Sequence, residues 1–282
     1  MSGANSGTQS PGAESAFGSA YAWRRDRLPK VVATLPQRPD NLGKIIGDEV
    51  IAAGLAHRLF PGDPVVLGHL QTAARAAGVA AQLLAPTAPT HAAFPLEERG
   101  LPPVQVPRRD AHGLTFLLGE AVQGFWAAFA SREDAALAAL AALPLEALDV
   151  RGEFAPYMAC GFKTLQALHR NAPSFPADLK EWLSSTDPEE LPDWAISQAL
   201  LVEAPAIRMI LASTEGSTPA EFDQALAEAL ERHEQFWAGQ NSMADLLALP
   251  ALALACRKRD MGYRTAVRSV YLPQSVVEAF AL

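Results

Sequence analysis

The chain has 282 residues, of which 49% are hydrophobic and 19% charged, and its formal net charge at pH 7 is −8. A chain of this length can bury one large core or two small ones. Its acidity disfavours non-specific binding to a nucleic-acid backbone and favours a basic partner. The two cysteines, Cys160 and Cys256, are too few for a disulfide framework or a metal-ligand cluster, which suits a reducing cytosol.

Residues 1–39 are rich in serine, glycine and proline, a composition that predicts a flexible N-terminal tail. A basic group within residues 24–30 suits either a partner contact or, more commonly, a solvated tail. Residues 1–27 contain no apolar run followed by a cleavage site. The most apolar stretch, residues 246–256, is shorter than the roughly 20 residues that span a bilayer. We therefore expect a soluble, cytoplasmic protein.

Helical periodicity predicts one helix over residues 40–60 and a second over residues 64–85, separated by the breaker pair Pro61-Gly62. Residues 86–107 contain six prolines in 22 residues and show no helical period. We expect a long crossover loop or flap there, and loops of this length are usually functional or mobile.

Further helices are expected over residues 110–126, 131–143, 153–170, 175–183 and 194–211, the last with Pro205 as a kink. No window alternates apolar and polar residues as a strand would. The helices do not recur at the fixed period of tandem helical repeats. The sequence therefore predicts an all-α fold, a single bundle of about ten helices over residues 40–282, preceded by a flexible N-terminal tail over residues 1–39.

Residues 218–273 carry the strongest helical signals. Residues 218–221 form a capping box with proline at the first helical position, and an apolar stripe at helical spacing follows as far as Trp237. A second, almost wholly apolar helix is expected over residues 243–259, with Pro250 as a kink or a restart.

Three features of this part of the chain occur together: an acidic helix that ends in Phe236-Trp237, the helix LALPALALACRKRDMGY, and the closing SVYLPQSVV. A fainter group of such features lies upstream, at Phe125-Trp126-Ala127 and the residues that follow it. Together they resemble the Imm49 immunity proteins of bacterial polymorphic toxin and type VI secretion systems. One departure is Val270, which stands where an acidic residue is expected before the tyrosine. The resemblance implies a protein that binds and neutralises a cognate toxin.

The sequence contains no G-x-S-x-G elbow, Walker loop, G-x-G-x-x-G or H-E-x-x-H motif. None of its six histidines has a second histidine or cysteine at i+3 or i+4, as a metal site on a helix would need. His233, Cys160 and Cys256 lie in apolar helical patterns, where packed side chains are commoner than ligands or nucleophiles. We therefore predict no catalytic residue, no cofactor and no metal.

The acidity of the chain is local. Residues 178–234 hold 13 acidic and three basic residues, a net charge of −10, whereas the rest of the chain carries +2. A rotation of 100° per residue places part of the helix after Thr218 opposite its apolar stripe, in one polar face. An ordinary solvated face is the alternative to a binding surface. The predicted partner-binding residues are Asp187, Glu189, Glu190, Asp193, Gln224, Glu228, Glu231 and Gln235.

A chain without an export signal would meet its toxin in the cytosol, so the expected partner attacks nucleic acid, nucleotide or the translation machinery. An acidic surface would mimic a phosphate backbone, attract a basic nuclease and occlude its active site. Two alternatives stay open. A helical scaffold or adaptor would bind an endogenous partner and need no adjacent toxin gene. An α-helical enzyme would show a deep pocket that holds several perturbed titratable groups.

Overall fold

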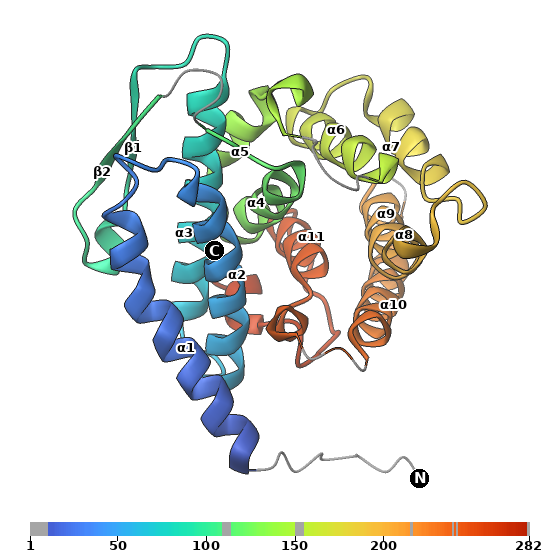
Figure 1. Cartoon of the computed structure of the whole chain (residues 1–282). Helices are drawn as coiled ribbons and strands as arrows, with labels where there is room; N and C mark the ends of the chain where they lie inside the picture. Colours follow the sequence, from blue (N-terminus) through green and yellow to red (C-terminus); the bar gives the residue numbers. More distant parts are fainter. Residues whose placement is uncertain are drawn as a thin grey trace.

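Helices form almost all of the structure, a computed structural model that describes residues 11–108, 114–149, 155–214, 217–238, 240 and 242–280 (Figure 1). The first half contains α1 (Pro11–Val32), α2 (Asn41–Leu59), α3 (Val65–Leu84), β1 (His91–Phe94), η1 (Glu97–Arg99), β2 (Val104–Pro107), α4 (Leu118–Ser131) and α5 (Asp134–Ala142). The second half contains η2 (Leu145–Ala147), α6 (Pro156–Arg170), α7 (Phe175–Ser184), α8 (Asp193–Gln198), η3 (Ala199–Glu203), α9 (Ala204–Leu211), α10 (Pro219–Trp237), η4 (Met243–Leu246), α11 (Leu249–Asp260) and α12 (Gln274–Val277). Ten helices of at least seven residues lie within the described part, which confirms the predicted all-α bundle.

The core is centred on α4, which packs between α3, α6 and α11. Its buried aromatic residues Phe125, Trp126 and Phe129 face neighbours rich in alanine. At Gly124 the absence of a side chain sets the distance between α3 and α4, since an added Cβ would lie 2.2 Å from the Cβ of Ala77. Small residues on neighbouring helices let the aromatic residues of α4 pack closely against them.

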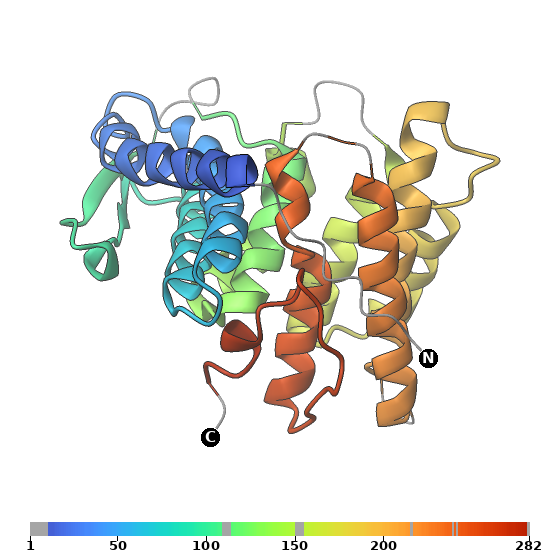
Figure 2. The ribbon, with the colours of Figure 1, turned by 90° about the horizontal axis from the view of Figure 1, so that it is seen from below.

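The N-terminal segment corrects one prediction. Residues 11–32 form α1 rather than a flexible tail, and α1 packs on α2. Figure 2 shows α1 lying across the α2–α3 pair, at the opposite end of the molecule from α7–α9. Tyr21, Leu28 and Val32 are buried in the core. The serine- and glycine-rich composition masked these apolar residues, which recur one or two helical turns apart. Residues 1–10 lie outside the described part.

The proline-rich segment also differs from the expected loop. β1 and β2 form an antiparallel hairpin in which His91 pairs with Pro107 and Phe94 with Val104. Ala92, Phe94 and Val106 are buried, and β1 packs against α3. Most of the prolines lie between or before the strands, where a missing N–H costs no ladder hydrogen bond. Strands of four residues are too short to show an alternating pattern in the sequence.

The stretch Asp193–Leu211 is one helical run interrupted by the π-helical segment η3. Ala204 donates its N–H to the carbonyl of Ala199, five residues earlier. Pro205 follows immediately, and its ring would clash with a carbonyl in a regular α-helix. The predicted irregularity at Pro205 is therefore a π-helical segment. By length and composition this run could cross a membrane (mean hydropathy 1.3), but soluble core helices pass the same test and 39% of the run is buried.

Two other boundaries differ from the sequence-based expectation. The helix expected over residues 243–259 is split into η4 and α11, with Pro250 in the first turn of α11, so the proline marks a restart. The helix expected from residue 110 begins at Leu118. The predicted helix starts at residues 110 and 153 lie outside the described part of the chain.

Arg132 fastens the C-terminal segment to α4. It ends α4 in the left-handed conformation, with φ of 56°. Its guanidinium donates two hydrogen bonds of 3.0 and 3.1 Å to the carboxylate of Asp260 at the end of α11. It also donates to the carbonyls of Val276 (2.9 Å) and Val277 (3.2 Å) in α12. One side chain thus joins the ends of three helices.

A buried polar network joins α1, α2, α3 and η1. The hydroxyl of Tyr21 lies 3.1 Å from Nε2 of His69, and Nδ1 of His69 lies 2.8 Å from the carboxylate of Glu49. Arg99 approaches the same carboxylate at 3.6 Å. Because Glu49 accepts at Nδ1, that nitrogen carries hydrogen, and a neutral His69 can accept from Tyr21 at Nε2. The network fixes α1 and the hairpin to the bundle.

Candidate functional site

Four of the predicted acidic residues lie together on the connection between α7 and α8. Asp187 accepts a hydrogen bond of 3.0 Å from the backbone N–H of Glu189, which shapes the turn. Glu190 follows in this turn, and Asp193 lies in the first turn of α8. All four side chains are exposed. Within the described residues, none of these carboxylates forms an ion pair.

Large apolar side chains are exposed on the same two helices. Leu183 at the end of α7 and Trp194 and Leu200 along α8 and η3 are 48%, 49% and 44% exposed. An aromatic side chain surrounded by charged residues is the usual composition of a protein–protein contact. Trp194 was expected only as part of a helix, because interface and core aromatic residues look alike in a sequence.

The predicted residues on α10 lie on its exposed face, with one exception. Gln224, Glu231 and Gln235 are exposed, and Gln235 donates to Glu231 at 3.3 Å. Glu228 is half-buried and forms an ion pair with Arg208 of α9 and a longer contact, 3.9 Å, with Arg232. Its charge is thus compensated inside the molecule.

The α7–α8 and α10 groups lie on neighbouring parts of the bundle (Figure 1), and no ion pair or hydrogen bond joins them within the described residues. We call the eight predicted residues together with Trp194 the acidic surface. Asp223, which also belongs to the acidic segment, bonds instead to Thr265 and to the backbone N–H of Ala266.

A cavity of about 410 Å³ opens among α4, α6, α10 and α11, beside η3. Its walls are mostly apolar and include four aromatic side chains, Trp126, Trp182, Phe236 and Trp237. A pocket of this volume and apolar character is typical of a ligand site. The sequence does not reveal this cavity, because its lining comes from elements far apart in the chain, from α2 to α11.

Among the described residues that line this cavity, Glu203 is the only carboxylate. Burial raises its pKa to about 7, while side-chain hydrogen bonding from Gln198 and Trp182 acts to lower it. The Gln198 amide donates to it at 3.4 Å. Among the described residues no lysine or arginine pairs with Glu203. In the sequence, Glu203 is one of the 13 acidic residues over residues 178–234, and nothing sets it apart from the others.

Trp182 forms part of the cavity wall and is 1% exposed. Its indole lies on Gly161, where an added Cβ would come within 3.0 Å of the ring. The indole N–H is close enough to the Glu203 carboxylate to lower its pKa, but the two groups do not meet the geometry of a hydrogen bond. This buried donor therefore has no bonded acceptor in the described part. A buried donor without an acceptor is costly in a protein interior.

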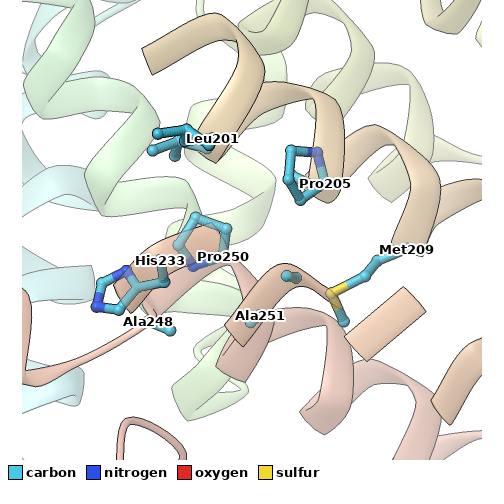
Figure 3. Close-up of a pocket in the computed structure, with 10 residues that line it drawn as sticks. Leu201, Pro205, Met209, His233, Ala248, Pro250 and Ala251 are labelled. Carbon is cyan, nitrogen blue, oxygen red and sulfur yellow. The ribbon is translucent and has the colours of Figure 1, made fainter. Parts of the chain in front are cut away.

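A smaller cavity of about 20 Å³, room for about one water molecule, continues the larger one toward α9. Figure 3 shows Leu201 and Pro205 on one side of it and Pro250 and His233 on the other. His233 lines both cavities. Its imidazole lies 2.8 Å from the carbonyl of Asp245 and packs against Tyr271.

The pKa of His233 is lowered, chiefly by burial, so the ring is neutral at pH 7. The two thiols are buried as expected; burial raises the pKa of Cys160, and that of Cys256 to about 12. No group of three His, Cys, Asp or Glu side chains within the described residues could hold a metal ion. The enzyme alternative required a deep pocket with several perturbed titratable groups. The described lining of this cavity has two, Glu203 and His233, and His233 is bonded to a backbone carbonyl and not to Glu203.

Replacing Glu203 by glutamine should change how stability depends on pH. A raised carboxyl pKa means that the folded state holds the proton more tightly than the unfolded state. The resulting stabilisation is present below about pH 4.5 and is lost as pH rises through about 7. Between pH 5 and 8, wild type should therefore lose about 2 kcal/mol relative to Glu203→Gln.

Urea unfolding at both pH values measures this difference. His233 and Tyr157, the titratable groups near Glu203, are present in both proteins, so their effects cancel. Glu190→Gln, which removes an exposed carboxylate, is the control and should show no such dependence. Parallel pH profiles for Glu203→Gln and wild type would contradict the assignment.

The comparisons with known proteins give one match. Residues 63–276 match the family model of Immunity protein 49, Imm49. No curated protein and no solved structure matches the chain. The match covers well over half of the chain and includes α3 to α11, and with them the acidic surface and every described residue that lines the two cavities except Val50. The chain therefore belongs to the Imm49 family of immunity proteins.

Proposed function

We propose that this protein neutralises a basic toxin that acts in the cytosol, a nuclease, by binding it through the acidic surface and covering its active site. Family membership supports toxin neutralisation itself. The observation that carries the finer proposal is the group of four exposed carboxylates that directly precede Trp194 in the chain and have no ion pair within the described residues.

The charges suit a nuclease because such enzymes hold phosphate groups with lysine and arginine. Carboxylates placed at similar spacing occupy the same cationic groups and attract them over several ångströms. Exposed charges act mainly on the association rate, and salt weakens them. Trp194, with Leu183 and Leu200, supplies the apolar contact that slows dissociation.

The proposal includes a place and a source. The protein acts in the cytoplasm, and its toxin is encoded by the adjacent gene and delivered by a neighbouring cell, as in type VI secretion. Co-expression with the product of that gene tests this part. Cells should survive the toxin only when the protein is present, and a neighbourhood without a toxin gene would favour a scaffold instead.

Charge reversal at Glu189 and Glu190 should slow toxin association about tenfold at low salt, with a much smaller change at high salt. Stopped-flow or surface-based kinetics at several salt concentrations measure the rate. Glu228 is unsuitable for this test, since its replacement would also break the pair with Arg208.

A double variant with the same charge change elsewhere, Glu97→Lys with Glu146→Lys, is the matched control because both side chains are exposed and distant in sequence. It should leave association nearly unchanged. Equal slowing in the two variants would show that net charge alone, and not the acidic surface, steers the toxin.

A further inference from the structure

The cavity beside η3 combines one unpaired carboxylate with an aromatic wall. Among the described residues that line it, Glu203 is the only side chain that carries a full charge when ionised, and none is a lysine or arginine. His233, the other titratable group, is neutral at pH 7 and does not repel a cation. A carboxylate held in apolar surroundings binds a cation more strongly than one in water.

The aromatic side chains suit a planar cation. Trp126, Phe236 and Trp237 line the same cavity, and Phe236 and Trp237 are only partly buried. A guanidinium stacks on such rings and also forms paired hydrogen bonds with a carboxylate, which an ammonium does not. An arginine side chain therefore fits this lining better than a lysine.

The site holds one unfavourable feature that a bound cation would relieve. Glu203 lies in the π-helical segment η3 with a pKa raised by burial, and among the described residues no lysine or arginine pairs with it. π-Helical segments occur frequently at functional sites. A bound cation would stabilise the ionised carboxylate and draw it into firm hydrogen bonds.

We propose that this cavity is a binding site for an arginine side chain of the toxin. The inference rests on the proposed function, because it takes the toxin as the source of the side chain. It adds a second contact to the acidic surface: exposed carboxylates attract the basic partner, and Glu203 with its aromatic wall holds one arginine in place.

Glu203→Gln tests the proposal. The variant keeps the size of the side chain and should fold at least as stably as wild type above pH 7, so lost binding would not reflect unfolding. Toxin dissociation, followed by surface-based kinetics at pH 7.5, should become at least tenfold faster with little change in association. Glu190→Gln, the control, should leave dissociation unchanged.

Double-mutant cycles identify the partner residue. Each surface arginine of the toxin is replaced by glutamine and measured against wild type and Glu203→Gln. One arginine should lose most of its effect when Glu203 is already replaced. Equal toxin dissociation from wild type and Glu203→Gln, or no coupling at any arginine, would overturn the proposal.

A small probe separates this proposal from the proposed function. N-acetyl-arginine amide, titrated against the protein alone, should change the fluorescence of the cavity tryptophans in wild type and much less in Glu203→Gln, whereas N-acetyl-glutamine amide should not. Identical responses to the two amides would count against the arginine site. If the toxin binds Glu203→Gln with unchanged affinity, the proposed neutralisation would still hold, and only the arginine site in the cavity would be contradicted.

Discussion

Replacing His69 by leucine should lower the free energy of unfolding by about 3–5 kcal/mol, because it leaves the buried Glu49 carboxylate without its hydrogen-bond donor. His69 is fully buried and Glu49 is 1% exposed. Without the imidazole, the Glu49 carboxylate would keep only the longer contact with Arg99, and the Tyr21 hydroxyl would lose its acceptor. Urea unfolding followed by circular dichroism measures the loss.

Two further variants test the reason for this loss. The double variant Glu49→Leu with His69→Leu should be less destabilised than His69→Leu alone, since it removes the buried carboxylate together with its donor. The Arg99 side chain, which loses its contact with Glu49, is 12% exposed. His91→Leu, at an exposed position of β1, should change stability by less than about 0.5 kcal/mol. A double variant that is less stable than His69→Leu would mean that packing, and not charge, explains the effect.

Replacing Arg132 by lysine should cost about 2–4 kcal/mol, although the charge is kept. The guanidinium bonds Asp260 through two of its nitrogens and reaches the carbonyls of Val276 and Val277 at the same time. The lysine ammonium is compact and not planar, so it cannot donate to all of these acceptors at once, and the carbonyls would lose their donor. Denaturant unfolding gives the free energy.

Arg38→Lys is the matched control, because the Arg38 side chain is 62% exposed and pairs only at 3.5 Å with Asp40. It should be nearly neutral, as exposed ion pairs usually are. Hydrogen exchange locates the damage in Arg132→Lys: the amides of α11 and α12 should exchange faster, while those of α1 and α2 should not. Uniform acceleration across all helices would argue against a local clamp.

Much of the helical architecture was predictable from local signals. The capping box is observed, with Thr218 accepting from the N–H of Glu221 and the Glu221 carboxylate accepting from the N–H of Thr218. Proline in the first turn predicted where α10 begins, and the apolar stripe ending near Trp237 predicted which side of the helix is buried. These signals involve residues within one or two turns of each other, so a sequence shows them directly.

Other features depend on contacts between distant segments. α1 was mistaken for a tail because its few apolar residues become meaningful only against α2 and α3. The hairpin of β1 and β2 has strands too short for a pattern. The cavity around Glu203 is lined by elements from α2 to α11, and nothing in the sequence separates Glu203 from the exposed carboxylates nearby. The acidic surface was predicted from charge alone, and its role stays a prediction.

The region shared with the Imm49 family begins at residue 63, so α1 and α2 lie outside it. A shortened protein starting there would not be a smaller version of the same molecule. It would leave His69 without Tyr21 and Glu49 and would strip a whole layer of side chains from one flank of α3. Such a fragment should aggregate when expressed, and the family boundary is therefore a poor place to cut the gene.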